Sequence, residues 1–228
     1  FESSDVLFYP TLRRTIDALD QGAEIAVVPI ENIVEGIVAP VVDRFVRRPL
    51  QIIAEVAIPV RFSVVMNHPF AQFVAQGQCS EWLAGHASDV VTTASNTEAL
   101  ALLLASNEPA AALIPEHLLT NENAGSQHYA KVVHDVTDVA HNVTRFVALQ
   151  AAQPLALPNH ATAYKSAVVI VDDADHPGLL LEHLQAFAVH QVNLLSLVSR
   201  PTGQKFGQYH FFIEFEGHLQ HSQVQAAL

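Results

Sequence analysis

The chain has 228 residues, half of which are hydrophobic, and it carries 11 Lys and Arg against 23 Asp and Glu, for a formal net charge of −12. It is long and apolar enough to form one large domain or two smaller domains around a buried core, which argues against a disordered protein. The excess negative charge repels phosphate backbones, so no nucleic-acid partner is expected.

A single cysteine, Cys79, excludes an intramolecular disulfide framework and a cysteine-rich zinc site, and it suits a reducing compartment. Apolar runs such as residues 99–105 are far shorter than the roughly 18–20 residues needed to cross a bilayer. The first residues lack the basic and then apolar character of a secretory signal. We therefore expect a cytoplasmic protein without a membrane partner. Since the first residue is not methionine, we also expect the sequence to begin inside a longer protein.

Short apolar runs rich in β-branched residues alternate with helical stretches along the first two thirds of the chain. Helices are predicted for residues 11–19, 34–45 and 96–105. Strands are predicted for residues 23–30, 51–60, 62–66, 90–92, 110–114, 131–136 and 144–150. This alternation indicates an α/β sandwich.

Glu31 and Asn32 directly follow the first predicted strand. Ligands commonly bind at strand ends in α/β sheets. The alternative is that Asn32 caps the next helix and that Glu31 is a solvated turn residue. Ser95 also precedes a predicted helix, where it serves either as an N-cap or as part of an anion-binding helix start.

Asn142, Thr144, Arg145 and Phe146 lie at the start of the last predicted strand of this region. In a regular strand, Thr144 and Phe146 face one side and Arg145 faces the other. The alternative is an ordinary edge strand with an exposed arginine.

Together these segments resemble the catalytic domain of the prephenate dehydratases. The resemblance covers most of residues 6–149 and rests on Pro-Ile-Glu-Asn at 29–32, Glu-Gly at 35–36 and Asn-x-Thr-Arg-Phe at 142–146. It implies a periplasmic-binding-protein-like catalytic region of two α/β subdomains over residues 1–150, with the active site in the cleft between them. By this resemblance the catalytic residues are Thr144, Arg145 and Phe146, and the substrate-binding residues are Glu31, Asn32, Ser95 and Asn142.

The family reaction converts prephenate to phenylpyruvate with loss of water and carbon dioxide, and it needs no cofactor. Loss of both groups makes the ring aromatic, so the protein mainly has to position the ring and donate a hydrogen bond to the departing hydroxyl. Thr144 is the expected donor. Arg145 is expected to hold a carboxylate through two parallel hydrogen bonds, and Phe146 to supply an apolar wall.

Three positions depart from the family pattern: Ile33 replaces a usual serine, Asn96 a usual threonine and Phe62 a common histidine. These departures motivate an alternative, a catalytically degenerate amino-acid-binding regulator of the same architecture. A third reading, a periplasmic solute receptor, is opposed by the absence of a signal and by the C-terminal segment.

Residues 151–164 contain two prolines and little periodicity, so we expect them to link the first domain to a second domain at residues 165–228. In the second domain, strands are predicted for residues 166–171, 193–200 and 208–216, and helices for residues 177–190 and 218–228. This βαββα order is a ferredoxin-like (βαββαβ) plan that needs one more strand, so we expect the last strand to be missing.

This C-terminal segment resembles the ACT regulatory domain of the same enzymes, through Gly-Leu-Leu-Leu at 178–181 and Val-Ser-Arg-Pro at 198–201. Val198 replaces the glutamate usual in the family. The resemblance implies that L-phenylalanine binds as an allosteric effector at the interface of a homodimer or homotetramer. The residues that this implies are Gly178, Leu179, Asn193, Leu194, Ser199 and Arg200. The alternative is a simple helix start and a solvated arginine.

Thirteen histidines raise the question of a metal site. His183 and His190 could share a helix face, as could His218 and His221. No cysteines or carboxylate cluster accompany them, so we expect no metal and instead solvated or interface histidines.

Overall fold

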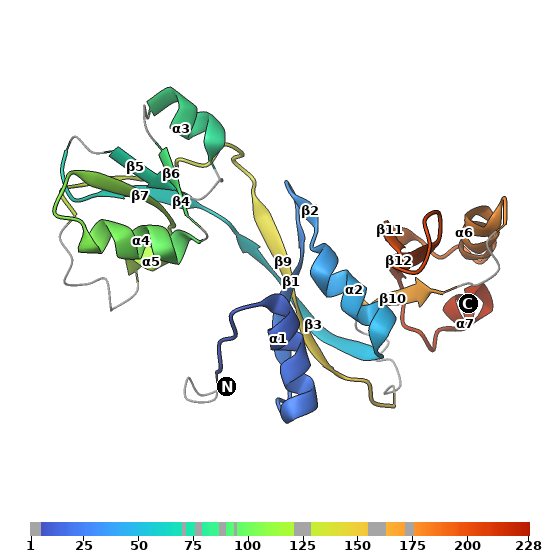
Figure 1. The fold of residues 1–228 in the computed structure, drawn as a ribbon. Helices are drawn as coiled ribbons and strands as arrows, with labels where there is room; N and C mark the ends of the chain where they lie inside the picture. Colours follow the sequence, from blue (N-terminus) through green and yellow to red (C-terminus); the bar gives the residue numbers. More distant parts are fainter. Residues whose placement is uncertain are drawn as a thin grey trace. The chain divides into compact units, whose positions relative to one another are not determined.

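The computed structural model describes residues 6–69, 72–75, 79–86, 90–93, 95–120, 129–154, 163–171 and 176–228. It is a mixed α/β structure, and the strands of these ranges form three sheets (Figure 1). The chain divides into two compact units. The first contains the described residues of Phe1–Glu31, Gly36–Val56 and Arg145–Leu228, and the second contains Asn32–Glu35 and the described residues of Ala57–Thr144.

A four-stranded sheet forms the centre of the first unit, in the order β2-β1-β9-β3. Its strands are β1 (Ala26–Asn32), β2 (Gly36–Ile37), β3 (Leu50–Pro59) and β9 (Val143–Ala151). In β1, Ala26, Val28 and Ile30 are all buried, which is the period of two that places one side of a strand in a core. The buried side of β1 packs against three helical elements: α1 (Leu12–Asp17), the 3-10 turn η2 (Ala18–Gln21) and α2 (Ala39–Arg47).

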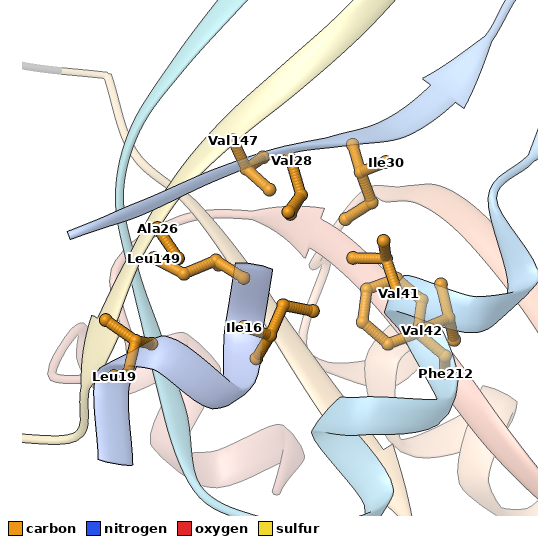
Figure 2. Close-up of a cluster of buried hydrophobic side chains, with 10 residues drawn as sticks. All are labelled: Ile16, Leu19, Ala26, Val28, Ile30, Val41, Val42, Val147, Leu149 and Phe212. Carbon is orange, nitrogen blue, oxygen red and sulfur yellow. The ribbon is translucent and has the colours of Figure 1, made fainter. Parts of the chain in front are cut away.

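The buried cluster of this sheet is continuous with the C-terminal part of the chain. Figure 2 shows Val41 and Val42 of α2 close to Phe212, which comes from a strand near the C-terminus. The Phe212 ring also lies 5.6 Å from the ring of Phe45, measured between centroids. Burial of one such side chain contributes roughly 1.5–3 kcal/mol, so these contacts hold the C-terminal sheet against α2.

The C-terminal sheet has the order β10-β12-β11, with both pairs antiparallel. Its strands are β10 (Lys165–Ile170), β11 (Leu194–Pro201) and β12 (Tyr209–Glu216), and its helices are α6 (Leu179–Val189) and α7 (Ser222–Ala227). Ile213 and Phe215 of β12 pack with Phe187 of α6 and Val224 of α7. Phe212 points from the other face into the α2 cluster, so β12 is covered on both sides.

The second unit is built on a five-stranded sheet of order β6-β5-β7-β4-β8. The strands are β4 (Phe62–Met66), β5 (Gln72–Ala75), β6 (Val90–Thr92), β7 (Ala110–Pro115) and β8 (Lys131–Val133). Helices cover both faces: Leu103 of α4 (Asn96–Ala105) packs on Val65, whereas Leu83 of α3 (Ser80–His86) packs with Val64. The short helix α5 (His117–Thr120) joins the α4 side. This burial of both faces explains why β4 and β7 are apolar along almost their whole length.

Most predicted elements are present, with local corrections. The predicted helix at 34–45 is wrong at its start, since Gly36 (φ +81°) and Ile37 form β2 and the helix begins only at Ala39, with Pro40 in its first turn. The helix expected from residue 218 begins at Ser222, the helix at 11–19 ends as the 3-10 turn, and β8 ends at Val133 rather than 136. Strand β5 and helix α5 were not predicted.

Residues 155–162 of the proposed linker lie outside the described residues, and the domain boundary there stays a prediction. None of the described helices is long and apolar enough to cross a membrane.

Candidate active site

The motif residues fall into two groups of polar contacts, and the first is centred on Asn32 at the end of β1. The side-chain oxygen of Asn32 accepts hydrogen bonds from the backbone N–H groups of Val34 and Glu35, both at 2.9 Å. Those donors fix the orientation of the amide, because its Nδ2 must then point the other way. Nδ2 donates to Asn142 Oδ1 at 2.6 Å and to Thr144 Oγ1 at 2.9 Å. Asn32 is only 8% exposed, and all of its hydrogen-bonding capacity is used within the protein.

This geometry tests the interpretation of Asn32 as a helix cap. Helix α2 has Val38 as its N-cap, without a side-chain hydrogen bond, so the interpretation of Asn32 as a helix cap is wrong. Asn32 instead closes the turn that follows β1 and joins it to the start of β9, a link supported by the bond from Ile33 N to Val143 O. Its amide nitrogen holds the side chains of Asn142 and Thr144 through hydrogen bonds.

The contacts of Thr144 leave its hydroxyl proton available. Its Oγ1 accepts the bond from Asn32, and within the described part of the chain no acceptor takes the Thr144 proton. A hydroxyl has one proton and two lone pairs, so acceptance from Asn32 orients the group without consuming its capacity to donate. Thr144 is half-buried.

The second group surrounds Arg145, the next residue along β9. Its Nη1 donates to Glu214 Oε1 at 2.6 Å and to Glu55 Oε2 at 3.2 Å. Its Nη2 donates to Glu214 Oε2 at 2.7 Å and to Glu31 Oε2 at 2.9 Å. Glu214, from β12, thus forms a bidentate pair, the strongest geometry for an arginine and a carboxylate.

Burial and charge differ among the members of this group. The side chain of Glu214 is 6% exposed and that of Arg145 17%, whereas Glu31 and Glu55 are each 39% exposed. Hydrogen bonding to Glu214 is the main cause that raises the pKa of Arg145 above its ordinary value, against the opposing effect of burial, and Glu55 and Glu31 add to it. Partial burial acts to raise the pKa of Glu55, but hydrogen bonds from Lys165 and Arg145 outweigh it and lower that pKa overall.

Ser95 and Phe146 lie outside both groups. Ser95 is the N-cap of α4, where its hydroxyl accepts a hydrogen bond from the backbone N–H of Glu98 at 3.1 Å. The interpretation of Ser95 as an N-cap is therefore confirmed. Phe146 is half-buried on β9. The alternation of side chains in a strand places it on the face opposite Arg145.

A cavity of about 220 Å³ lies at the start of α6 in the C-terminal part. Among its lining residues are His176, Gly178, Leu179, Tyr209 and Phe211. Gly178 caps α6 with φ +97°, a conformation that favours glycine, and the first backbone N–H groups of the helix follow it.

The other residues expected at an effector site do not line this cavity. Arg200 donates from Nε to Asp43 Oδ1 at 2.7 Å and from Nη2 to Asp43 Oδ2 at 3.0 Å, which raises the pKa of Arg200. The alternative interpretation of Arg200 as solvated is therefore wrong, because it forms a bidentate pair with α2. Asn193 and Ser199 are exposed, and Leu194 packs into the cluster beneath α6 and α7.

Glu55, Glu214 and Lys165 were not predicted as functional residues. Glu55 and Glu214 are 90 and 69 residues from Arg145 in sequence. The only available signal was the buried-strand pattern of β12, in which Glu214 is an acidic residue among apolar neighbours. In the described ranges, no group of three or more His, Cys, Asp or Glu side chains could hold a metal ion.

Comparison with known proteins relates most of the chain to one enzyme family. The family described as prephenate dehydratase matches residues 1–154. The chain is 34% identical to the prephenate dehydratase of Amycolatopsis methanolica, over 96% of this chain and 73% of that protein. It is 33% identical to the prephenate dehydratase of Corynebacterium glutamicum, over 95% of this chain and 70% of that protein.

Solved structures show the same relationship. A prephenate dehydratase from Arthrobacter aurescens, solved in complex with L-Phe, matches with a TM-score of 0.76 and 30% identity, over 97% of this chain and 75% of that chain. GqqA, described as a novel type of quorum quenching acylase, matches with a TM-score of 0.75 over 97% of this chain and 81% of that chain. Its identity is 20%, so this second likeness concerns the fold alone.

Proposed function

The chain belongs to the prephenate dehydratase family, and we propose that it converts prephenate to phenylpyruvate under feedback control by phenylalanine. The observation that carries the catalytic part is the hydrogen bond from Asn32 to Thr144, which orients a threonine hydroxyl whose proton has no acceptor among the described residues. Both residues belong to the segments that resemble the family, and they lie 112 positions apart in sequence.

Thr144 is proposed to donate to the departing ring hydroxyl. As the C–O bond breaks, negative charge develops on that oxygen, and a positioned donor stabilises it. The C–C bond to the ring carboxylate breaks at the same time, and its electron pair completes the aromatic ring. Carbon dioxide leaves, and the hydroxyl leaves as water once it gains a proton. A threonine hydroxyl is a weak acid, so Thr144 acts by hydrogen bonding and the proton comes ultimately from solvent.

Arg145 is proposed to bind a substrate carboxylate through two parallel hydrogen bonds. This requires an exchange, because in the structure its four terminal N–H groups are directed to three glutamates. Among the remaining family-like residues, Asn142, Glu31 and Ser95 are proposed to bind substrate, and Phe146 to contact its ring.

The C-terminal sheet and its two helices are proposed to form an ACT-type domain of ferredoxin-like plan that binds phenylalanine. The order βαββα and the cavity at Gly178 support this, since exposed N–H groups at a helix start can receive a carboxylate. The Arthrobacter aurescens relative was solved with L-Phe. Leu179, Asn193, Leu194, Ser199 and Arg200 are proposed to support the same site.

The proposed effector site includes a second subunit, as a homodimer or homotetramer. Strand β11 is at an edge of its sheet, and Leu195 and Leu197 on it are 41% and 42% exposed. An exposed apolar edge strand is a favourable surface for pairing with another chain. We propose that this assembly works in the cytoplasm.

The test is incubation of the purified protein with prephenate, with phenylpyruvate measured over time and phenylalanine binding measured by calorimetry. Phenylpyruvate formation well above the uncatalysed rate is expected, with inhibition by phenylalanine. Phenylalanine binding without any turnover would instead indicate a degenerate regulator of the same fold. Absence of both would refute the proposed function.

A further inference from the structure

We propose that Glu214 is the residue through which the C-terminal sheet controls access of the substrate carboxylate to Arg145. The inference rests on the proposed function, in which Arg145 binds substrate and the C-terminal sheet belongs to the phenylalanine sensor. It adds a specific contact that links the two.

Arg145 is already engaged by the glutamates around it. Its four terminal N–H groups are all directed to carboxylates, with both oxygens of Glu214 at 2.6 and 2.7 Å. Glu214 occupies the edge of the guanidinium formed by Nη1 and Nη2, and a substrate carboxylate that binds this edge must displace it. Substrate therefore cannot form this pair while Glu214 keeps its own.

The carboxylates and cations of this group do not balance in charge. Three carboxylates, Glu31, Glu55 and Glu214, surround two cations, Arg145 and Lys165, which leaves one net negative charge. Prephenate is a dianion and would be repelled by this group as it stands. Removal of one carboxylate makes the group neutral, so departure of a glutamate permits entry of the substrate.

Glu214 differs from Glu31 and Glu55 in the sheet that carries it. Glu31 and Glu55 come from β1 and β3, strands of the same sheet as Arg145. Glu214 comes from β12, which belongs to the C-terminal sheet. It is therefore the carboxylate that moves with the proposed sensor.

Glu214 shares its strand with residues that line the cavity. Tyr209 and Phe211, which line the cavity beside Gly178, are on the same strand as Glu214. The neighbouring strand β11 carries Arg200, which pairs with Asp43 of α2 as a second charged contact. A ligand in the cavity that favours the arrangement with Glu214 on Arg145 would inhibit by raising the KM for prephenate.

The experiment compares Glu214→Gln with Glu55→Gln, which removes the same charge from the group without touching the C-terminal sheet. In the wild type, phenylalanine should raise the KM for prephenate about tenfold. In Glu214→Gln it should raise that KM less than twofold, while calorimetry still detects phenylalanine binding. Glu55→Gln should respond to phenylalanine as the wild type does.

Inhibition as strong in Glu214→Gln as in the wild type would overturn the inference, as would equal loss of inhibition in Glu55→Gln. If Glu214→Gln does not fold, Asp43→Asn provides the test, because it weakens the pair between Arg200 and Asp43 and leaves the glutamates on Arg145 in place. Inhibition by phenylalanine should then fall at least twofold. Unchanged inhibition there would also overturn the inference. If the wild type makes no phenylpyruvate, the proposed function itself is refuted. If the protein makes phenylpyruvate but Glu214→Gln is inhibited as strongly as the wild type, only the inference about Glu214 is refuted.

Discussion

The amide of Asn32 donates to Thr144 Oγ1 at 2.9 Å while its oxygen closes the turn at Val34 and Glu35. One buried side chain therefore fixes both the turn after β1 and the rotamer of the proposed hydrogen-bond donor on β9. The Thr144 hydroxyl is therefore oriented by a neighbour whose own amide is fully hydrogen-bonded within the protein.

Asn32→Asp should lower kcat by about ten- to a hundredfold with a smaller change in KM. Aspartate can still accept from Val34 and Glu35, but it cannot donate, so the Thr144 hydroxyl would direct its proton to the new carboxylate. Steady-state kinetics with prephenate measures the effect. If Asn32 acts through Thr144, the double variant with Thr144→Val should be no slower than Thr144→Val alone. Additive losses would show an independent role for Asn32.

Arg145→Lys should lower kcat/KM by about ten- to a hundredfold, because lysine keeps the charge but cannot form two parallel bonds to one carboxylate. The same change leaves Glu214 with a poorer partner, so thermal unfolding should shift downward as well. Kinetics and unfolding on one preparation separate the two effects. A variant with normal kcat/KM would show that Arg145 has a structural role only.

Gly178→Ala should abolish inhibition by phenylalanine and leave turnover without effector close to normal. Gly178 has φ +97° and lines the cavity, so a Cβ there strains the helix start that is proposed to receive the carboxylate. Gly203→Ala is the matched control, since Gly203 has φ +77°, open space around it and no place in the cavity lining. Loss of inhibition in both variants, or in neither, would contradict the proposal that phenylalanine binds at this cavity.

Cys79 gives a prediction on stability against pH. Burial, with a smaller contribution from Asp138, raises the pKa of the Cys79 thiol from 9.0 to about 11. The folded state therefore keeps this proton longer than the unfolded state. The resulting stabilisation is complete below about pH 9 and is lost as pH rises through about 11; it is on the order of 2 kcal/mol. Urea unfolding of wild type and Cys79→Ala at pH 7 and pH 10.5 should show a steeper loss for the wild type. Equal losses would contradict the raised pKa.

The strands were predictable where the apolar pattern is continuous. Phe62–Met66 and Val90–Thr92 have the bounds expected from sequence, because short runs rich in apolar and β-branched residues favour a strand without help from the rest of the chain. The start of α2 was not predictable in this way. Residues 34–38 were expected to form the first turn of this helix. Their conformation is determined instead by the turn that Asn32 closes and by the pairing of Gly36–Ile37 in the sheet.

The proposed catalytic residues were chosen from motifs, whereas their hydrogen-bonding partners could not be. The pairing of Asn32 with Thr144 depends on the adjacency of β1 and β9, which no local pattern specifies. The three carboxylates around Arg145 come from β1, β3 and β12, so their convergence depends on tertiary packing. Sequence alone suggested an arginine free to bind substrate, and the structure shows one already bound by glutamates.

The most direct test of the account is to measure kcat for prephenate in the wild type and in Thr144→Val, with phenylpyruvate as the observed product. Valine has nearly the same shape as threonine and lacks the hydroxyl, so the fold and substrate binding should be retained. The account predicts phenylpyruvate formation by the wild type and a kcat at least about a hundredfold lower in Thr144→Val, with KM changed much less. No product from the wild type, or an equal kcat in the two proteins, would contradict it.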